Sequence, residues 1–204
     1  MLLVFSRTGE RRYTVEAQRP GLPHLLMSPA PGYDPLMPHD MMHMVVEAQL
    51  GLGHGIFGQL AAGGNAGTFH LPMKNGASAR DIARTRRRVA ARGKKLLREG
   101  RDECIESERA AFVCWQEWRA RSSSHDRRKL SGALNQSKLD EICEHLDHLS
   151  SHWSRLTVGG SMAVSWPDLA IVSTSVAPSS NSAEGSTKDT THTLHSRLLT
   201  TTTN

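Results

Sequence analysis

The sequence feature that most limits how this chain can fold is an apolar stripe within residues 135–156. Its members recur at alternating steps of three and four residues: Leu139, Ile142, Leu146, Leu149, Trp153 and Leu156. An α-helix turns once every 3.6 residues, so these six side chains lie on one face of a helix. That face is stable in water only when another element covers it. The rest of the chain must therefore supply an apolar surface about 25 Å long.

Three short β-prone segments predict a sheet that supplies this surface. Residues 2–6 and 12–17 are rich in β-branched and aromatic side chains, and a glycine-containing connection of hairpin length separates them. Residues 161–166 alternate between small or polar and apolar side chains before Pro167. Residues 169–172 are a further candidate for an edge strand. We expect an α+β fold in which a small three-stranded antiparallel sheet, the hairpin plus the late strand, is packed by amphipathic helices.

Two segments are expected to lack regular structure. Residues 20–38 contain six prolines and form an irregular connection. Residues 173–204 contain 16 Ser or Thr among 32 residues and no aromatic side chain, so they have little to bury and are expected to form a disordered tail. The prediction is one domain over residues 1–172, followed by this tail.

The helix predicted after Pro38 carries the most chemically suggestive pattern. His39 and His43 are four residues apart and share a face, as in the H-E-x-x-H zinc motif, and Asp40 takes the place of the general base of that motif. Glu47, one turn beyond His43, is a ligand or an orienting partner, and His148 from a second histidine stripe is a completing ligand. These residues predict a site for zinc or another divalent transition metal, with hydrolysis as its chemistry. The alternative is an exposed polar face in which Asp40 interacts favourably with the helix N-terminus.

Positive charge is concentrated in one part of the chain. Residues 80–129 contain 16 basic and 8 acidic side chains, whereas residues 1–79 contain 5 of each. The helix predicted over residues 80–100 supports an alternative function, a non-catalytic interaction module that contacts nucleic acid or an acidic protein. The side chains expected at the phosphates are Arg86, Arg87, Arg88, Lys94 and Lys95. A simply solvated basic helix is the other interpretation.

A second helix is predicted over residues 102–119. Ile105, Phe112 and Trp115 are large apolar side chains that we expect to face the core, with Trp118 as a further candidate.

Residues 53–58 spell G-x-G-x-x-G, which is the glycine pattern of a dinucleotide-binding turn. That fingerprint requires a preceding strand and a βαβ unit, whereas a helix is predicted before it here. We therefore expect a corner that breaks the helix.

The sequence also bears on location. Its longest apolar-leaning stretch, residues 41–62, is interrupted by polar side chains, and the apolar run at the start is too short for a secretory signal. The three cysteines are an odd number and form no C-x-x-C pair. These features predict a cytoplasmic protein with no membrane partner.

Three pieces of the chain together resemble a group of small bacterial proteins known only as uncharacterised hypothetical proteins. They are the N-terminal hairpin, the HDxxHxxxE helix that begins at His39, and the late strand with the pattern GGS(x4)WP that ends at Pro167. The resemblance covers residues 1–62 and 135–167. It implies a single small α+β domain and no particular activity, and this chain departs from the group in its proline-rich connection and its tail.

Overall fold

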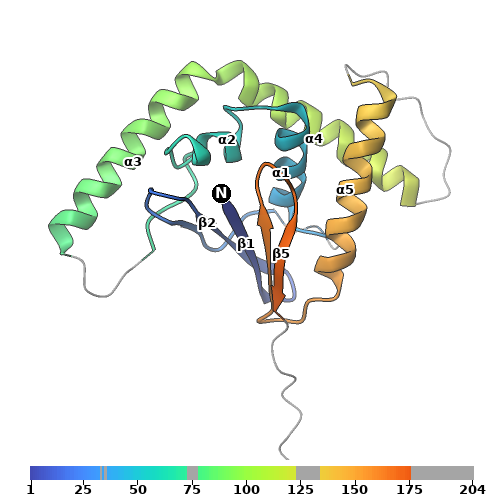
Figure 1. The fold of residues 1–204 in the computed structure, drawn as a ribbon, viewed down its shortest axis with the longest axis horizontal. Coiled ribbons are helices and arrows are strands. Elements are labelled where there is room, and N and C mark those ends of the chain that lie inside the picture. The colour runs from blue at the N-terminus through green and yellow to red at the C-terminus, as the bar shows by residue number, and fades with distance from the viewer. Residues whose placement is uncertain (33, 35, 73–77, 123–133, 176–204) are drawn as a thin grey trace, which may run out of the picture.

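The computed structural model describes residues 1–32, 34, 36–72, 78–122 and 134–175, and these form an α+β fold (Figure 1). The strands are β1 (Leu2–Gly9), β2 (Arg12–Gln18), β3 (Leu25–Met27), β4 (Ser161–Ser165) and β5 (Ile171–Ser175). The helices are α1 (His39–Leu50), α2 (Ile56–Ala61), α3 (Ala79–Glu99), α4 (Arg101–Ser122) and α5 (Gln136–Ser154). The predicted class is confirmed.

The sheet is antiparallel with the strand order β3-β2-β1-β4-β5. The N-terminal hairpin is β1 and β2, and β4 pairs with the other edge of β1, so Phe5 lies opposite Val15 on one side and Met162 on the other. All three side chains are fully buried. The sheet has five strands and not the three expected, because β3 and β5 extend it at its two edges.

Of the two additional strands, β3 falls in a segment whose composition hides it, whereas β5 overlaps the candidate edge strand at residues 169–172. β3 is only three residues long and lies inside the proline-rich connection, where it pairs with β2. β5 includes residues 173–175, which the sequence assigned to the tail, and pairs with β4. The rest of the predicted tail, residues 176–204, lies outside the described residues.

The helix α5 confirms the prediction of a helix with one apolar face within residues 135–156. All six apolar side chains of the stripe are buried, five of them within α5 and Leu156 just after its end. The Asn135 side chain caps the helix by accepting a hydrogen bond from the Lys138 amide at 2.8 Å. An N-cap of this kind satisfies one of the amides that a helix leaves free at its start.

The helix α1 lies at the centre of the molecule and contacts α2, α4 and α5 (Figure 1). Eight consecutive residues of this helix, from Asp40 to Glu47, are buried. Gly51 ends the helix in the left-handed conformation, with φ of 67°. A helix buried on every side must satisfy each of its polar side chains inside the protein.

The helix α4 packs with a different face from the one that the sequence suggested. Ile105 and Phe112 are exposed, whereas Ser107, Ala111 and Cys114 are buried. Ser107 of this face contacts His43 and Glu47 of α1. The expected core face is therefore wrong for Ile105 and Phe112, whereas Trp118 is buried and Trp115 packs partly buried against the core. No helix in the described part of the chain combines the length and the apolar character that a bilayer span requires.

Candidate metal site on the central helix

The polar row of α1 points into the protein. Asp40 is 5% exposed, His43 2% and Glu47 0%, while His39 at the start of the helix is exposed. The alternative interpretation of this row as a solvated face is therefore wrong. Each buried group must have a partner, and the partners come from three other elements.

Glu47 caps the helix α2 from outside it. Its carboxylate accepts hydrogen bonds from the backbone amides of Ile56 at 2.7 Å, Phe57 at 2.8 Å and Gly58 at 3.3 Å. A β-carbon at Gly55 would lie 2.2 Å from the carboxyl carbon of Glu47, so only glycine leaves room for this approach. The G-x-G-x-x-G segment is thus the predicted corner. Its amides bind an internal carboxylate where a dinucleotide fold would bind a pyrophosphate.

Burial raises the pKa of Glu47 to about 7. The three amides and the hydroxyl of Ser107, which also donates to this carboxylate, act in the opposite direction and lower the pKa. These donors are what keep an ionised Glu47 tolerable in the core near neutral pH.

Ser107 on α4 connects Glu47 to His43. Its hydroxyl donates to Glu47 Oε1 at 3.1 Å, and its Oγ lies 3.4 Å from His43 Nδ1. A serine hydroxyl has one hydrogen, so Oγ accepts from His43 and Nδ1 carries the proton. The other ring nitrogen, Nε2, then carries the lone pair of the ring and accepts a hydrogen bond from Nε2 of His39. The sequence suggested that Glu47 orients His43 directly, and the structure places Ser107 between them.

The Nε2 atom of His43 faces a small cavity. It lies 3.2 Å from Nε2 of His39 and 3.8 Å from a carboxylate oxygen of Glu108. Burial lowers the pKa of His43 and so favours the neutral ring. The cavity has a volume of about 350 Å³ and is lined by Gly32, Asp34, His39, His43, Glu108, Ala111, Phe112 and Trp115.

Asp40 lies beside Tyr13 of β2 and is not among the residues that line this cavity. The Tyr13 hydroxyl donates to Asp40 Oδ2, and burial raises the pKa of Asp40. Two carboxylates do line the cavity, Glu108 and Asp34. Asp34 accepts hydrogen bonds from the indole of Trp115 at 3.2 Å and the amide of Leu36 at 2.8 Å. Spacing alone placed Asp40 beside the histidines, and its rotation about the helix axis directs it to the sheet.

His148 is exposed on α5 and packs against His152, with the ring centroids 4.8 Å apart. It does not line the cavity of His39 and His43. Within the residues that the structure describes, no three His, Cys, Asp or Glu side chains are already arranged to hold a metal ion. The structure thus brings together His39, His43 and, through Ser107, Glu47.

The sequence did not indicate Ser107, Glu108 or Asp34 as site residues. Ser107 and Glu108 come from α4, more than sixty residues after His43. A signal for Ser107 exists in the sequence, since Ser107, Ala111 and Cys114 form a stripe of small residues at helical spacing.

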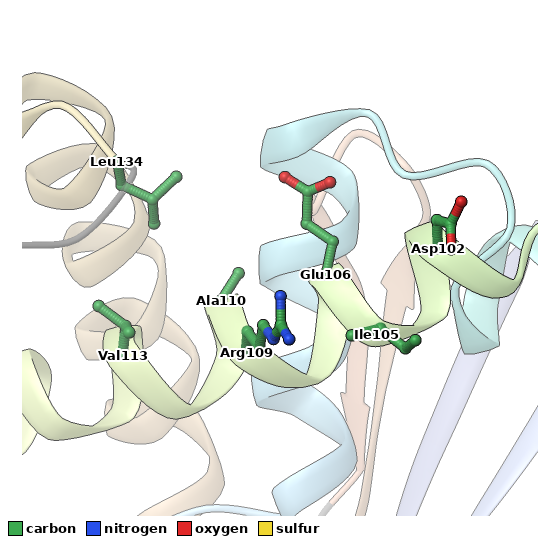
Figure 2. Close-up of a pocket in the computed structure, with 7 residues that line it drawn as sticks. All are labelled: Asp102, Ile105, Glu106, Arg109, Ala110, Val113 and Leu134. Carbon is green, nitrogen blue, oxygen red and sulfur yellow. The ribbon is translucent and has the colours of Figure 1, made fainter.

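A larger hollow of about 640 Å³ lies on another face of α4 (Figure 2). Figure 2 shows Glu106 and Leu134 reaching toward the same space from α4 and from the start of α5, with Arg109 nearby. No histidine or cysteine is among its lining residues within the described chain. Its walls therefore offer nothing typical of a transition-metal site.

The basic side chains predicted to meet phosphates are all exposed on α3: Arg86, Arg87, Arg88, Lys94 and Lys95. They lie on a different element from the histidines of α1.

Comparison of the chain with protein-family models, curated proteins and solved structures gives no match. The resemblance to the bacterial group stays a prediction, and any functional assignment depends on the geometry of this chain.

Proposed function

We propose that this protein binds one divalent transition metal ion, with zinc as the first candidate, through His39 and His43. The observation that supports the proposal most directly is the 3.2 Å separation of the two Nε2 atoms at the wall of a cavity. Zinc binds histidine nitrogen at about 2.0–2.1 Å, so two ligands at a tetrahedral angle are about 3.3 Å apart. The spacing of the two nitrogens therefore fits one ion, which would replace the hydrogen bond between the rings and the proton that His39 donates in it.

Glu108 is the third ligand in this proposal. Its carboxylate oxygen lies 3.8 Å from Nε2 of His43, and its side chain is 69% exposed. An exposed glutamate can rotate toward a cation at little energetic cost, because no packing holds it in place. Two histidines and one carboxylate form a ligand set found in catalytic zinc sites, and it leaves a fourth position open.

The cavity beside the ion has room for a small molecule, since ligand pockets start at about 300 Å³. A metal-bound water in the open position would be activated for hydrolysis. Asp34, on the wall of the same cavity, is the carboxylate in place to accept its proton. We therefore propose a hydrolase-like chemistry for the loaded site.

The test measures metal content and zinc affinity of untagged protein, with a chelator competition for affinity. One zinc per chain is expected in the wild type, with binding lost in His43→Ala and His39→Ala and weakened in Glu108→Gln. His148→Ala is the matched control and should bind normally. His39 is exposed, so its variant is expected to fold, and thermal melts check this for each protein. Wild type without stoichiometric zinc, or loss of zinc in His148→Ala alone, overturns the proposal.

We also propose a cytoplasmic location. Its support is that the three cysteines, Cys104, Cys114 and Cys143, are all unpaired, as is usual where thiols are kept reduced.

A further inference from the structure

We propose that the outer face of α3 binds the phosphate backbone of duplex DNA. The helix contains nine basic and two acidic residues, and all nine basic side chains are exposed. In Figure 1 α3 runs along the outer edge of the molecule, and the elements it packs against are α2 and α4. This surface is independent of the proposed metal site.

The charges form a single face. Val89, Gly93 and Leu96 are the buried seam of α3. At 100° per residue, six basic side chains fall within an arc of about 100° on the opposite side. They are Arg80, Arg84, Arg87, Lys94, Lys95 and Arg98. We call these six residues the basic face.

The six members of the basic face are all positively charged, and one of them, Lys95, lies 3.7 Å from the neighbouring carboxylate of Glu99. The two acidic residues of the helix, Asp81 and Glu99, both fall outside the arc when each residue is rotated by 100° from the one before. From Arg80 to Arg98 the face extends about 27 Å. Of the side chains that the sequence predicted at the phosphates, Arg86 falls near the seam and Arg88 falls just outside the arc, so neither belongs to the basic face. At the far end, α4 begins with the acidic residues Asp102 and Glu103, which limits the footprint to α3.

The composition of this face favours nucleic acid over a protein or a membrane. The one other residue that falls within the same arc of the helix is Ala91, so the basic face contains no large apolar side chain. Protein partners are held by buried aromatic and apolar anchors, and membrane-surface helices insert an apolar face. The apolar seam of α3 is already covered by the protein. Four of the six side chains are arginines, whose planar guanidinium groups bind phosphate through two hydrogen bonds.

The shape of the face favours duplex DNA. Single strands are bound by stacking bases on aromatic side chains, and α3 contains none. The major groove of B-DNA, about 12 Å wide, admits a helix, whereas that of A-form RNA is deep and narrow. A face of about 27 Å matches about eight base pairs at 3.4 Å each. Contacts to phosphate position a protein without reading sequence, so we expect binding that is independent of sequence.

The test is fluorescence anisotropy of the full chain with a labelled 20-base-pair DNA duplex at 50 and 200 mM salt. Six phosphate contacts predict a slope of log K against log salt of about −5, which corresponds to about a 10³-fold loss of affinity across this range. The variant Arg84→Gln/Arg87→Gln/Lys94→Gln should reduce the slope by about three. The control Arg12→Gln/Arg109→Gln/Arg155→Gln removes the same charge from exposed positions elsewhere and should keep the slope.

Further binding measurements test whether the basic face prefers another polyanion to duplex DNA. Duplex RNA, single-stranded DNA and polyglutamate are measured at both salt concentrations, and each should bind more weakly than duplex DNA. Thermal melts show whether both triple variants remain folded. The proposal is overturned if the wild type does not bind duplex DNA at 50 mM salt, if both triple variants lose affinity equally, or if one of these three polyanions binds more tightly.

Discussion

Gly55→Ala should destabilise this protein strongly, and it should do so only when Glu47 is present. Gly55 has φ of −64°, which alanine adopts readily, so the backbone imposes no strain. The added β-carbon would lie 2.2 Å from the carboxyl carbon and 2.4 and 2.5 Å from the oxygens of Glu47. The carboxylate must therefore move away from the three amides and from Ser107.

The expected cost follows from the hydrogen bonds that are lost. A buried donor left without an acceptor costs about 1–3 kcal/mol, and some of these donors will find water or a new partner. We expect Gly55→Ala to lower the free energy of unfolding by about 2–4 kcal/mol. About 1 kcal/mol of this reflects the preference for glycine over alanine at an N-cap. In a Glu47→Ala background only the N-cap contribution of about 1 kcal/mol remains. The double-mutant cycle should therefore give a coupling energy between positions 47 and 55 of about 1–3 kcal/mol.

The assay is urea unfolding at pH 8, where Glu47 is ionised, followed by tryptophan fluorescence for the four proteins of the cycle. Gly53→Ala is the matched control, because a β-carbon at Gly53 meets nothing within 4 Å. Equal costs of Gly55→Ala in the two backgrounds, or a cost no larger than that of Gly53→Ala, would refute the reasoning.

Three further predictions concern the same region and the end of the chain. Burial raises the pKa of Glu47 from 4.5 to about 7, so the folded protein keeps a proton that the unfolded chain has released. This stabilisation is complete below about pH 4.5 and lost as the pH rises through 7, by about 3 kcal/mol, and unfolding curves of wild type and Glu47→Gln should diverge accordingly. Parallel curves would contradict it. Ser107→Ala removes the acceptor for the His43 ring and should weaken zinc binding by about 10- to 100-fold, whereas Ser154→Ala should not, and equal affinities would count against the relay. A chain ending at Ser175 should melt within about 2 °C of the full chain because residues 176–204 have little apolar surface to bury, and one that also lacks β5 should melt earlier.

The elements that the sequence predicts well are those whose signal is local. Five members of the apolar stripe lie within α5, and Asn135 marks the start of the helix, so its buried face could be predicted without knowledge of its neighbours. The hairpin of β1 and β2 is similarly self-contained. β3 could not be found in this way, because three residues cannot show a period and its pairing with β2 is what defines it.

The face of α4 was misassigned for a physical reason. Large apolar side chains such as Ile105 and Phe112 dominate a search for hydrophobic periodicity, yet both are exposed. The contact with α1 instead uses Ser107, which lies between His43 and Glu47, and the small residues Ala111 and Cys114 are buried on the same side of α4. The partners that α4 brings to the histidines depend on this contact between helices, and one sequence does not specify it.

The buried polar residues of α1 differ in which of their hydrogen-bonding atoms contact other elements of the core. This difference underlies the metal position that we propose. Asp40 accepts a hydrogen bond from the Tyr13 hydroxyl, and Glu47 accepts hydrogen bonds from three backbone amides and from Ser107. Both carboxylates therefore connect α1 to other elements. His43 uses Nδ1 in the same way, while its Nε2 faces His39 and the cavity. Desolvating an imidazole is costly unless both of its nitrogens are used. In the structure Nε2 of His43 meets this requirement through its hydrogen bond with the exposed His39, and the metal ion that we propose would take the place of that bond.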